Sequence, residues 1–120
     1  MTRRNLEMVR GDTLPFRVTV TNAGDSVNLQ GASFRMTAKF DIGDSDGDAV
    51  FSITSPAYII ITDALNGIIS VNIPPSATTS LPPRECNLYY DIQMEDSTES
   101  IYTISSGILT VYPDVSVTTS

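Results

Sequence analysis

At 120 residues, this chain has room for one domain with one hydrophobic core and for no second domain of ordinary size. Its 41% hydrophobic content excludes an intrinsically disordered chain, and its formal net charge of −7 argues against nucleic-acid binding, which needs a basic surface. The sequence contains no histidine, so it lacks the usual general base, the commonest metal ligand and the usual partner of a serine or cysteine nucleophile. We therefore expect a protein that catalyses no reaction and holds no cofactor.

Residues 1–5 are basic and precede the first credible strand, residues 6–9. Nothing in this short segment could anchor it to the domain's own core, so we expect an extended arm, with Arg3 and Arg4 reaching a neighbouring subunit. The segment lacks the apolar run of a signal peptide, which predicts folding in the cytoplasm where the chain is made. No apolar stretch approaches the roughly 20 residues of a membrane-spanning helix, so we expect no membrane contact.

Alternation of apolar and polar residues predicts the first long strands. It runs through residues 14–21, stops at a turn-rich stretch over residues 22–28, and resumes in residues 32–40. The acidic segment 41–48 contains two glycines and indicates an exposed loop.

Two short runs rich in β-branched residues, 49–54 and 57–62, are separated by a proline, which interrupts a strand ladder. A third run, residues 68–73, follows the dipeptide Asn66-Gly67. Both residues of that dipeptide tolerate a positive φ, so the pattern predicts a hairpin over residues 57–73.

The last third of the chain begins with a connection, residues 76–83, that has room for one helical turn at most. Residues 86–95 form the longest clean alternation and predict a central strand, with Tyr89 in the polar phase. Residues 101–104 and 108–112, separated near Gly107, predict a further hairpin.

The pattern as a whole predicts an all-β, antiparallel β-sandwich or barrel of eight or nine short strands over residues 6–112, with a polar tail over residues 113–120. The apolar phase of the alternations places five large side chains inside the sandwich: Phe16, Phe34, Leu88, Tyr90 and Ile92.

Two features could carry chemistry, and each has a simpler interpretation. The lone cysteine, Cys86, lies in the apolar phase of its strand and is interpreted as a core residue. The acidic loop offers four carboxylates at spacings that resemble a calcium loop, but Ala49 and Ser55 stand where an EF-hand needs glycine and glutamate. A solvated loop is favoured over a cation site for these residues: Asp41, Asp44, Asp46 and Asp48.

The charges are unevenly distributed along the chain. Residues 1–39 hold six basic and three acidic groups, whereas residues 40–120 hold one basic and eleven acidic groups. This asymmetry would let a basic part of one subunit meet an acidic part of a neighbour, although both parts could also simply be solvated. The candidate partner-binding residues are Arg3, Arg4, Arg17, Arg35 and Lys39.

Several segments, in order, resemble the immunoglobulin-like domain at the N-terminus of phage baseplate upper proteins. They are the stretch Val9 to Phe16, then Asn28-Leu29-Gln30-Gly31, then Gly67 to Ile73, then Tyr89 to Ile92, and then Tyr102-Thr103-Ile104 with Gly107 to Val111. The resemblance covers nearly the whole chain and implies an immunoglobulin-like sandwich. It also implies a place in a phage virion, although a fold alone does not decide which module of the virion this is.

The functional hypothesis is a capsid decoration or cement protein, oligomeric, that binds the major capsid protein and stabilises the shell. If the chain is a complete gene product, it ends soon after the domain with no receptor-binding region, which favours decoration over a baseplate upper protein. The alternative is a tail or baseplate adaptor, and a calcium- or carbohydrate-binding module is a more remote one.

Overall fold

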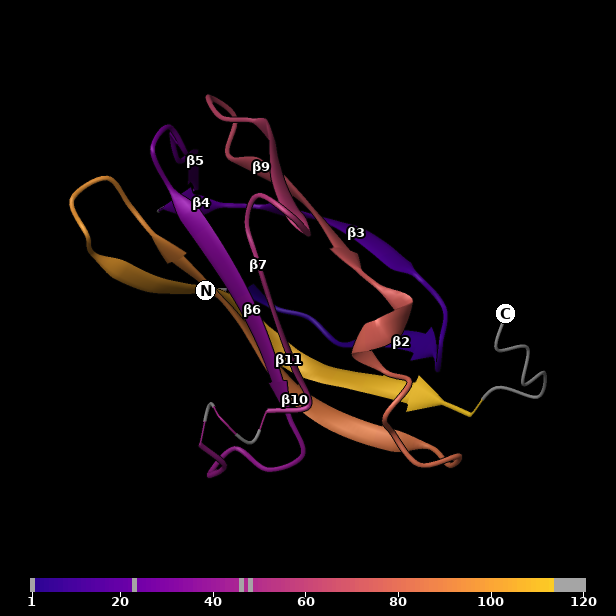
Figure 1. Cartoon of the computed structure of the whole chain (residues 1–120). Coiled ribbons are helices and arrows are strands. Elements are labelled where there is room, and N and C mark those ends of the chain that lie inside the picture. The colour runs from indigo at the N-terminus through magenta and orange to yellow at the C-terminus, as the bar shows by residue number, and fades with distance from the viewer. Residues whose placement is uncertain (1, 23, 46, 48, 114–120) are drawn as a thin grey trace.

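In the computed structural model, residues 2–22, 24–45, 47 and 49–113 are described, and they form two β-sheets packed face to face (Figure 1). Among these described residues, helical structure is limited to short 3-10 turns such as η2 (Pro75–Ala77), which lies in the predicted connection. No helix in the described part of the chain is long and apolar enough to span a lipid bilayer.

The larger sheet has the order β1-β11-β10-β6-β7, and β2 also pairs with β11. Its strands are β1 (Thr2–Arg3), β2 (Leu6–Val9), β6 (Ser33–Lys39), β7 (Phe51–Thr54), β10 (Cys86–Glu95) and β11 (Ile101–Tyr112). All neighbours are antiparallel except β1 and β2, which run parallel to β11. The predicted central strand is confirmed, because β10 lies between β6 and β11.

The smaller sheet has the order β3-β9-β8, with β3 (Leu14–Thr19), β9 (Ile68–Ile73) and β8 (Ile59–Asp63). The short strands β4 (Thr21–Asn22) and β5 (Asp25–Ser26) pair separately. Chain order and pairing match an immunoglobulin-like sandwich, in which the second, fifth and fourth strands form one sheet and the third, sixth and seventh form the other. The predicted fold class is therefore confirmed. The predicted hairpin over residues 57–73 is confirmed as β8 and β9, with Gly67 at a φ of 70°.

The core lies between the two sheets and draws apolar side chains from both. Four of the five predicted core residues are buried, and Phe16 is only half-buried. One side of the Phe16 ring packs on the core, and the guanidinium of Arg4 lies over the ring at 5.5 Å. Cys86 is buried as a free thiol, as predicted.

The predicted hairpin of residues 101–104 and 108–112 is wrong, because both segments belong to the single strand β11. The register moves from Ile92 opposite Ser105 to Gln93 opposite Thr103, so Ile104 is an extra residue in a β-bulge. The bulge buries two successive residues, Ile104 and Ser105, and so reverses the alternation of apolar and polar residues along the strand. A search for strict alternation therefore divides this one strand into two.

The expectation that residues 1–5 form an arm with no anchor in the domain is wrong for the described residues 2–5. The edge of β11 offers backbone groups to an extended neighbour, and β1 pairs with Ser105 and Ser106 there. The Arg4 amide donates to the Ser106 carbonyl at 2.9 Å, and the Ile108 amide donates to Asn5 Oδ1 at 3.1 Å. Of the predicted tail over residues 113–120, all but Pro113 lies outside the described residues.

Candidate functional site

The outer face of the larger sheet carries a row of polar side chains at the centre of the molecule. Successive side chains of a strand point to opposite faces, so β10 directs Leu88, Tyr90 and Ile92 into the core and Tyr89 and Asp91 outward. The register places Asp91 between Thr37 of β6 and Ser106 of β11, and Ser106 pairs in turn with Arg3 of β1. One row thus crosses four strands.

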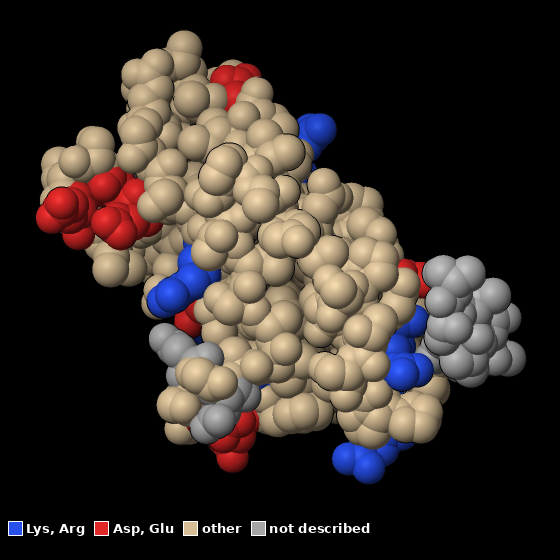
Figure 2. Space-filling view, viewed as in Figure 1, with Lys and Arg blue, Asp and Glu red and all other residues tan. Residues whose placement is uncertain are grey.

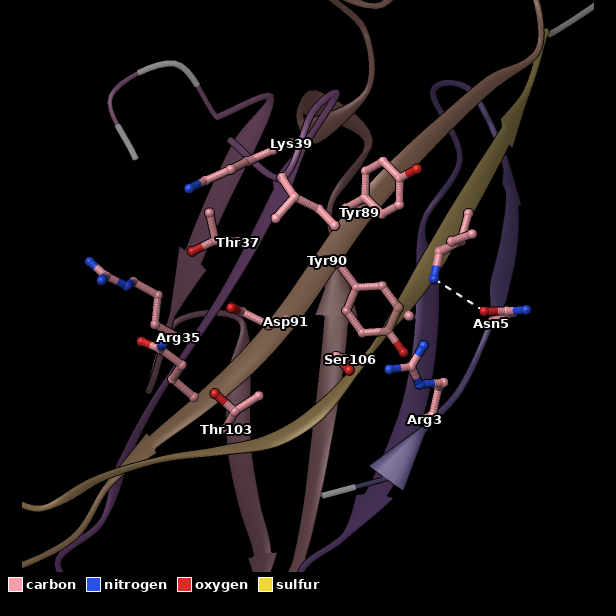
Figure 3. A pocket seen from close by; sticks show the side chains of 14 residues that line it. Arg3, Asn5, Arg35, Thr37, Lys39, Tyr89, Tyr90, Asp91, Thr103 and Ser106 are labelled. Carbon is pink, nitrogen blue, oxygen red and sulfur yellow. Dashed lines mark hydrogen bonds between the residues drawn. The ribbon is translucent and has the colours of Figure 1, made fainter. Parts of the chain in front are cut away.

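An apolar pair lies beside this row. Tyr89 is directly opposite Ile108 on β11 and directly opposite Lys39 on β6. The exposed fractions are 42% for Tyr89 and 36% for Ile108, so both large side chains are open to solvent on this face. Together with the polar row they line a shallow hollow of about 500 Å³ (Figure 3).

The hollow is positively charged although the chain as a whole is acidic. Its lining contains the cations Arg3, Arg35 and Lys39 and one carboxylate, Asp91, for a net formal charge of +2. In Figure 3, Arg35 and Lys39 extend from β6 on one side, and Arg3 lies on the other side. We call this set of residues the basic face: Arg3, Arg35, Lys39, Tyr89, Asp91 and Ile108.

Lys39 also holds the neighbouring loop in place. Its Nζ donates to the carbonyl oxygen of Asp44 at 2.8 Å, and the Asp41 carboxylate accepts from the Gly43 amide at 3.2 Å. Ile42, with 71% of its surface exposed, extends the apolar lining of the hollow from this loop.

The structure separates the five basic residues that the sequence singled out as partner-binding. It brings Arg3, Arg35 and Lys39 together at the hollow. Arg4 is exposed and instead reaches the other sheet, where its Nη1 donates to the Arg17 carbonyl at 2.9 Å, so it ties the N-terminal segment of one sheet to β3 of the other. Arg17 lies exposed on β3, on the opposite outer face of the sandwich.

Sequence reasoning missed Asp91, Ile108 and Ile42 as parts of a site. The position of Tyr89 in the polar phase of a strand was the available signal, because an aromatic residue there faces solvent. Which other residues lie beside Tyr89 depends on the register of three separate strand pairs. No local sequence pattern encodes that register.

One partly buried hydroxyl, on the inner side of the sheet, helps to hold the basic face together. The hydroxyl of Tyr90, on the inner side of β10, donates a short hydrogen bond to the carbonyl oxygen of Arg4. Burial raises the pKa of Tyr90, so the hydroxyl keeps its proton and remains a donor. This bond helps to hold the segment that carries Arg3 against β11.

The acidic loop does not assemble a metal site from its described residues. Asp41 and Asp44 are described, whereas Asp46 and Asp48 lie outside the described residues. Across the described ranges, no three histidine, cysteine, aspartate or glutamate side chains gather closely enough to hold a metal ion.

A scan against protein-family models finds no match to this chain, and a search of curated proteins finds none either.

Proposed function

We propose that this domain is a non-catalytic structural protein of a phage virion, a capsid decoration protein that binds the shell as an oligomer and stabilises it. The observation that carries the proposal is the basic face. An exposed tyrosine and isoleucine lie directly opposite each other there on the neighbouring strands β10 and β11, with arginine and lysine around them.

This composition suits a surface that binds protein. Tyrosine and arginine are enriched where protein interfaces are energetically important, because one gives a large rigid contact and the other pairs with carboxylates in a planar fork. The sequence resemblance to a phage virion module and the absence of histidine point to assembly and away from catalysis.

Repetition accounts for how weak contacts could stabilise a shell. A single exposed ion pair contributes only about 0–1 kcal/mol, but a decoration protein repeats its contacts over many copies that are linked to one another. A modest surface such as the basic face is therefore sufficient in a lattice.

The test is to add the purified protein to shells that lack it and to heat both samples. We expect the decorated shells to withstand a higher temperature. The variant Arg35→Ala should reduce this gain, whereas Arg17→Ala, which removes an exposed arginine from the opposite outer face, should not. Equal disruption temperatures with and without the protein would contradict the proposal.

The second candidate, a tail or baseplate adaptor, rests on the same resemblance and differs in copy number. Hundreds of copies per virion would support the shell, and a multiple of three or six in the tens or below would support the tail. Quantitative mass spectrometry of purified particles measures this number.

A further inference from the structure

We propose that the tip of the β10–β11 hairpin in one copy docks on the basic face of a second copy, so that copies associate head to tail. This inference deepens the proposed function by naming the segment that occupies the basic face. Self-association is tested with the purified protein alone, so its outcome is independent of whether the protein binds a shell.

The hairpin tip, residues 95–102, carries acidic and apolar groups that complement the net positive charge and the apolar pair of the basic face. Glu95 and Glu99 are exposed there, next to Ile101 and Tyr102 with exposed fractions of 63% and 51%. Figure 2 shows acidic atoms gathered at the end of the molecule where this hairpin projects. Acidic and apolar groups of the tip thus match basic and apolar groups of the face.

The tip is also ordered before any partner arrives. Asp96 Oδ1 accepts hydrogen bonds from the Thr98 amide at 2.9 Å, from the Thr98 hydroxyl at 2.6 Å and from the Ser100 amide at 3.0 Å. These bonds, the Thr98 hydroxyl first, lower the pKa of Asp96 and keep its carboxylate charged within the loop. A preformed loop loses little conformational entropy on docking, and Glu95 and Glu99 rather than Asp96 are left to meet the partner.

The contact has to be between two molecules. Arg35 is directly opposite Gln93 and so lies near Glu95 of its own hairpin, but Glu99 lies four residues beyond the end of β10, in the turn that leads away from Tyr89, Asp91 and Ile108. The turn therefore projects away from the centre of its own basic face. Because it meets a different surface on the partner, the association is heterologous, which gives closed rings or open filaments.

Four charge variants test the two surfaces. Arg35→Glu changes the basic face and Glu99→Lys changes the tip, and each should raise the Kd of self-association about tenfold. Arg84→Glu and Glu85→Lys make the same changes in net charge in the connection before β10 and should leave the Kd unchanged. Arg3→Glu supplies a second change on the basic face in case Arg35→Glu does not fold, which a thermal melt shows.

The measurement is sedimentation velocity of the full chain over a range of concentrations. We expect oligomers at low ionic strength that dissociate near 1 M salt, where the Debye length falls to about 3 Å. Mixing Arg35→Glu with Glu99→Lys should restore association, because each then supplies a surface complementary to the other. A monomer under all conditions would overturn the inference, as would no recovery on mixing or equal losses in the control variants.

Discussion

Tyr90 connects the core of the sandwich to the N-terminal segment. Its ring is buried among the inner side chains of the larger sheet, and its hydroxyl bonds the backbone of Arg4, 86 residues earlier in the chain. Burial is the main reason that its pKa is raised, and hydrogen bonding with Ser105 and the charge of Arg4 partly oppose that effect.

We predict that this tyrosine makes the protein sensitive to alkaline pH. The folded state holds the Tyr90 proton more tightly than the unfolded chain does. The free energy of unfolding is therefore unaffected by this group below about pH 10 and falls as the pH rises through the raised pKa. The variant Tyr90→Phe should lose about 1 kcal/mol at neutral pH with its hydrogen bond and show a smaller further loss at alkaline pH.

Urea unfolding at several pH values between neutral and strongly alkaline measures this effect. High salt is used because the pKa of Tyr112, an exposed residue, is raised mainly by the charge of Glu7, and salt screens that interaction. Tyr89→Phe, which removes an exposed hydroxyl from the same strand, is the control. Parallel pH profiles for Tyr90→Phe and the unmodified protein would show that Tyr90 has no such role.

At the scale of elements, the pairing of β1 and β2 with β11 depends on Gly107. A Cβ atom at this position would lie 2.0 Å from the Arg4 carbonyl oxygen and 2.8 Å from the Arg4 carbonyl carbon, both of which belong to the backbone. Glycine therefore allows the N-terminal segment to cross β11 closely enough for its hydrogen bonds to form.

Gly107→Ala should push this segment away from β11 and lower the free energy of unfolding by about 1–3 kcal/mol. Chemical denaturation measures the loss, and hydrogen exchange should show faster exchange at the amides of Arg4 and Ile108. Gly43→Ala is the matched control, because a Cβ there would meet only a side-chain oxygen of Asp41 at 3.9 Å. Equal stability of the two variants would refute the role assigned to Gly107.

The sequence was sufficient for the elements that follow a clean alternation. Strands β6, β9 and β10, the turn at Gly67 and the core positions of Leu88 and Ile92 were all predictable from period two and turn chemistry. The continuity of β11 was not predictable, because the bulge changes the apolar phase.

The pairing of residues 2–5 with β11 also could not be predicted from the sequence. That pairing joins backbone groups more than 100 residues apart, and the segment carries no apolar pattern from which the pairing could be predicted. For the same reason, the sequence indicated Arg35 and Lys39 as binding residues but could not separate Arg3, which lies with them, from Arg4, which bonds the backbone of β3 in the other sheet.

At the scale of the whole molecule, the charge asymmetry along the chain is not an asymmetry between two halves in space. The basic N-terminal third supplies strands to both sheets, so Arg17 and Arg35 lie on opposite outer faces. The contrast that remains is within one sheet, between the basic face at its centre and the acidic hairpin tip at its end. A subunit with both surfaces can bind one copy through its hairpin tip and another through its basic face, so the same contact repeats along an assembly.

The proposed function requires that a phage particle carries this protein, and a three-dimensional electron microscopy map of that particle tests the proposal most directly. We predict sandwich-shaped density on the outside of the capsid, with the outer face of β6, β10 and β11 covered by a neighbouring chain. Density for the domain in the tail, or a capsid-bound domain whose basic face is open to solvent, would contradict this account.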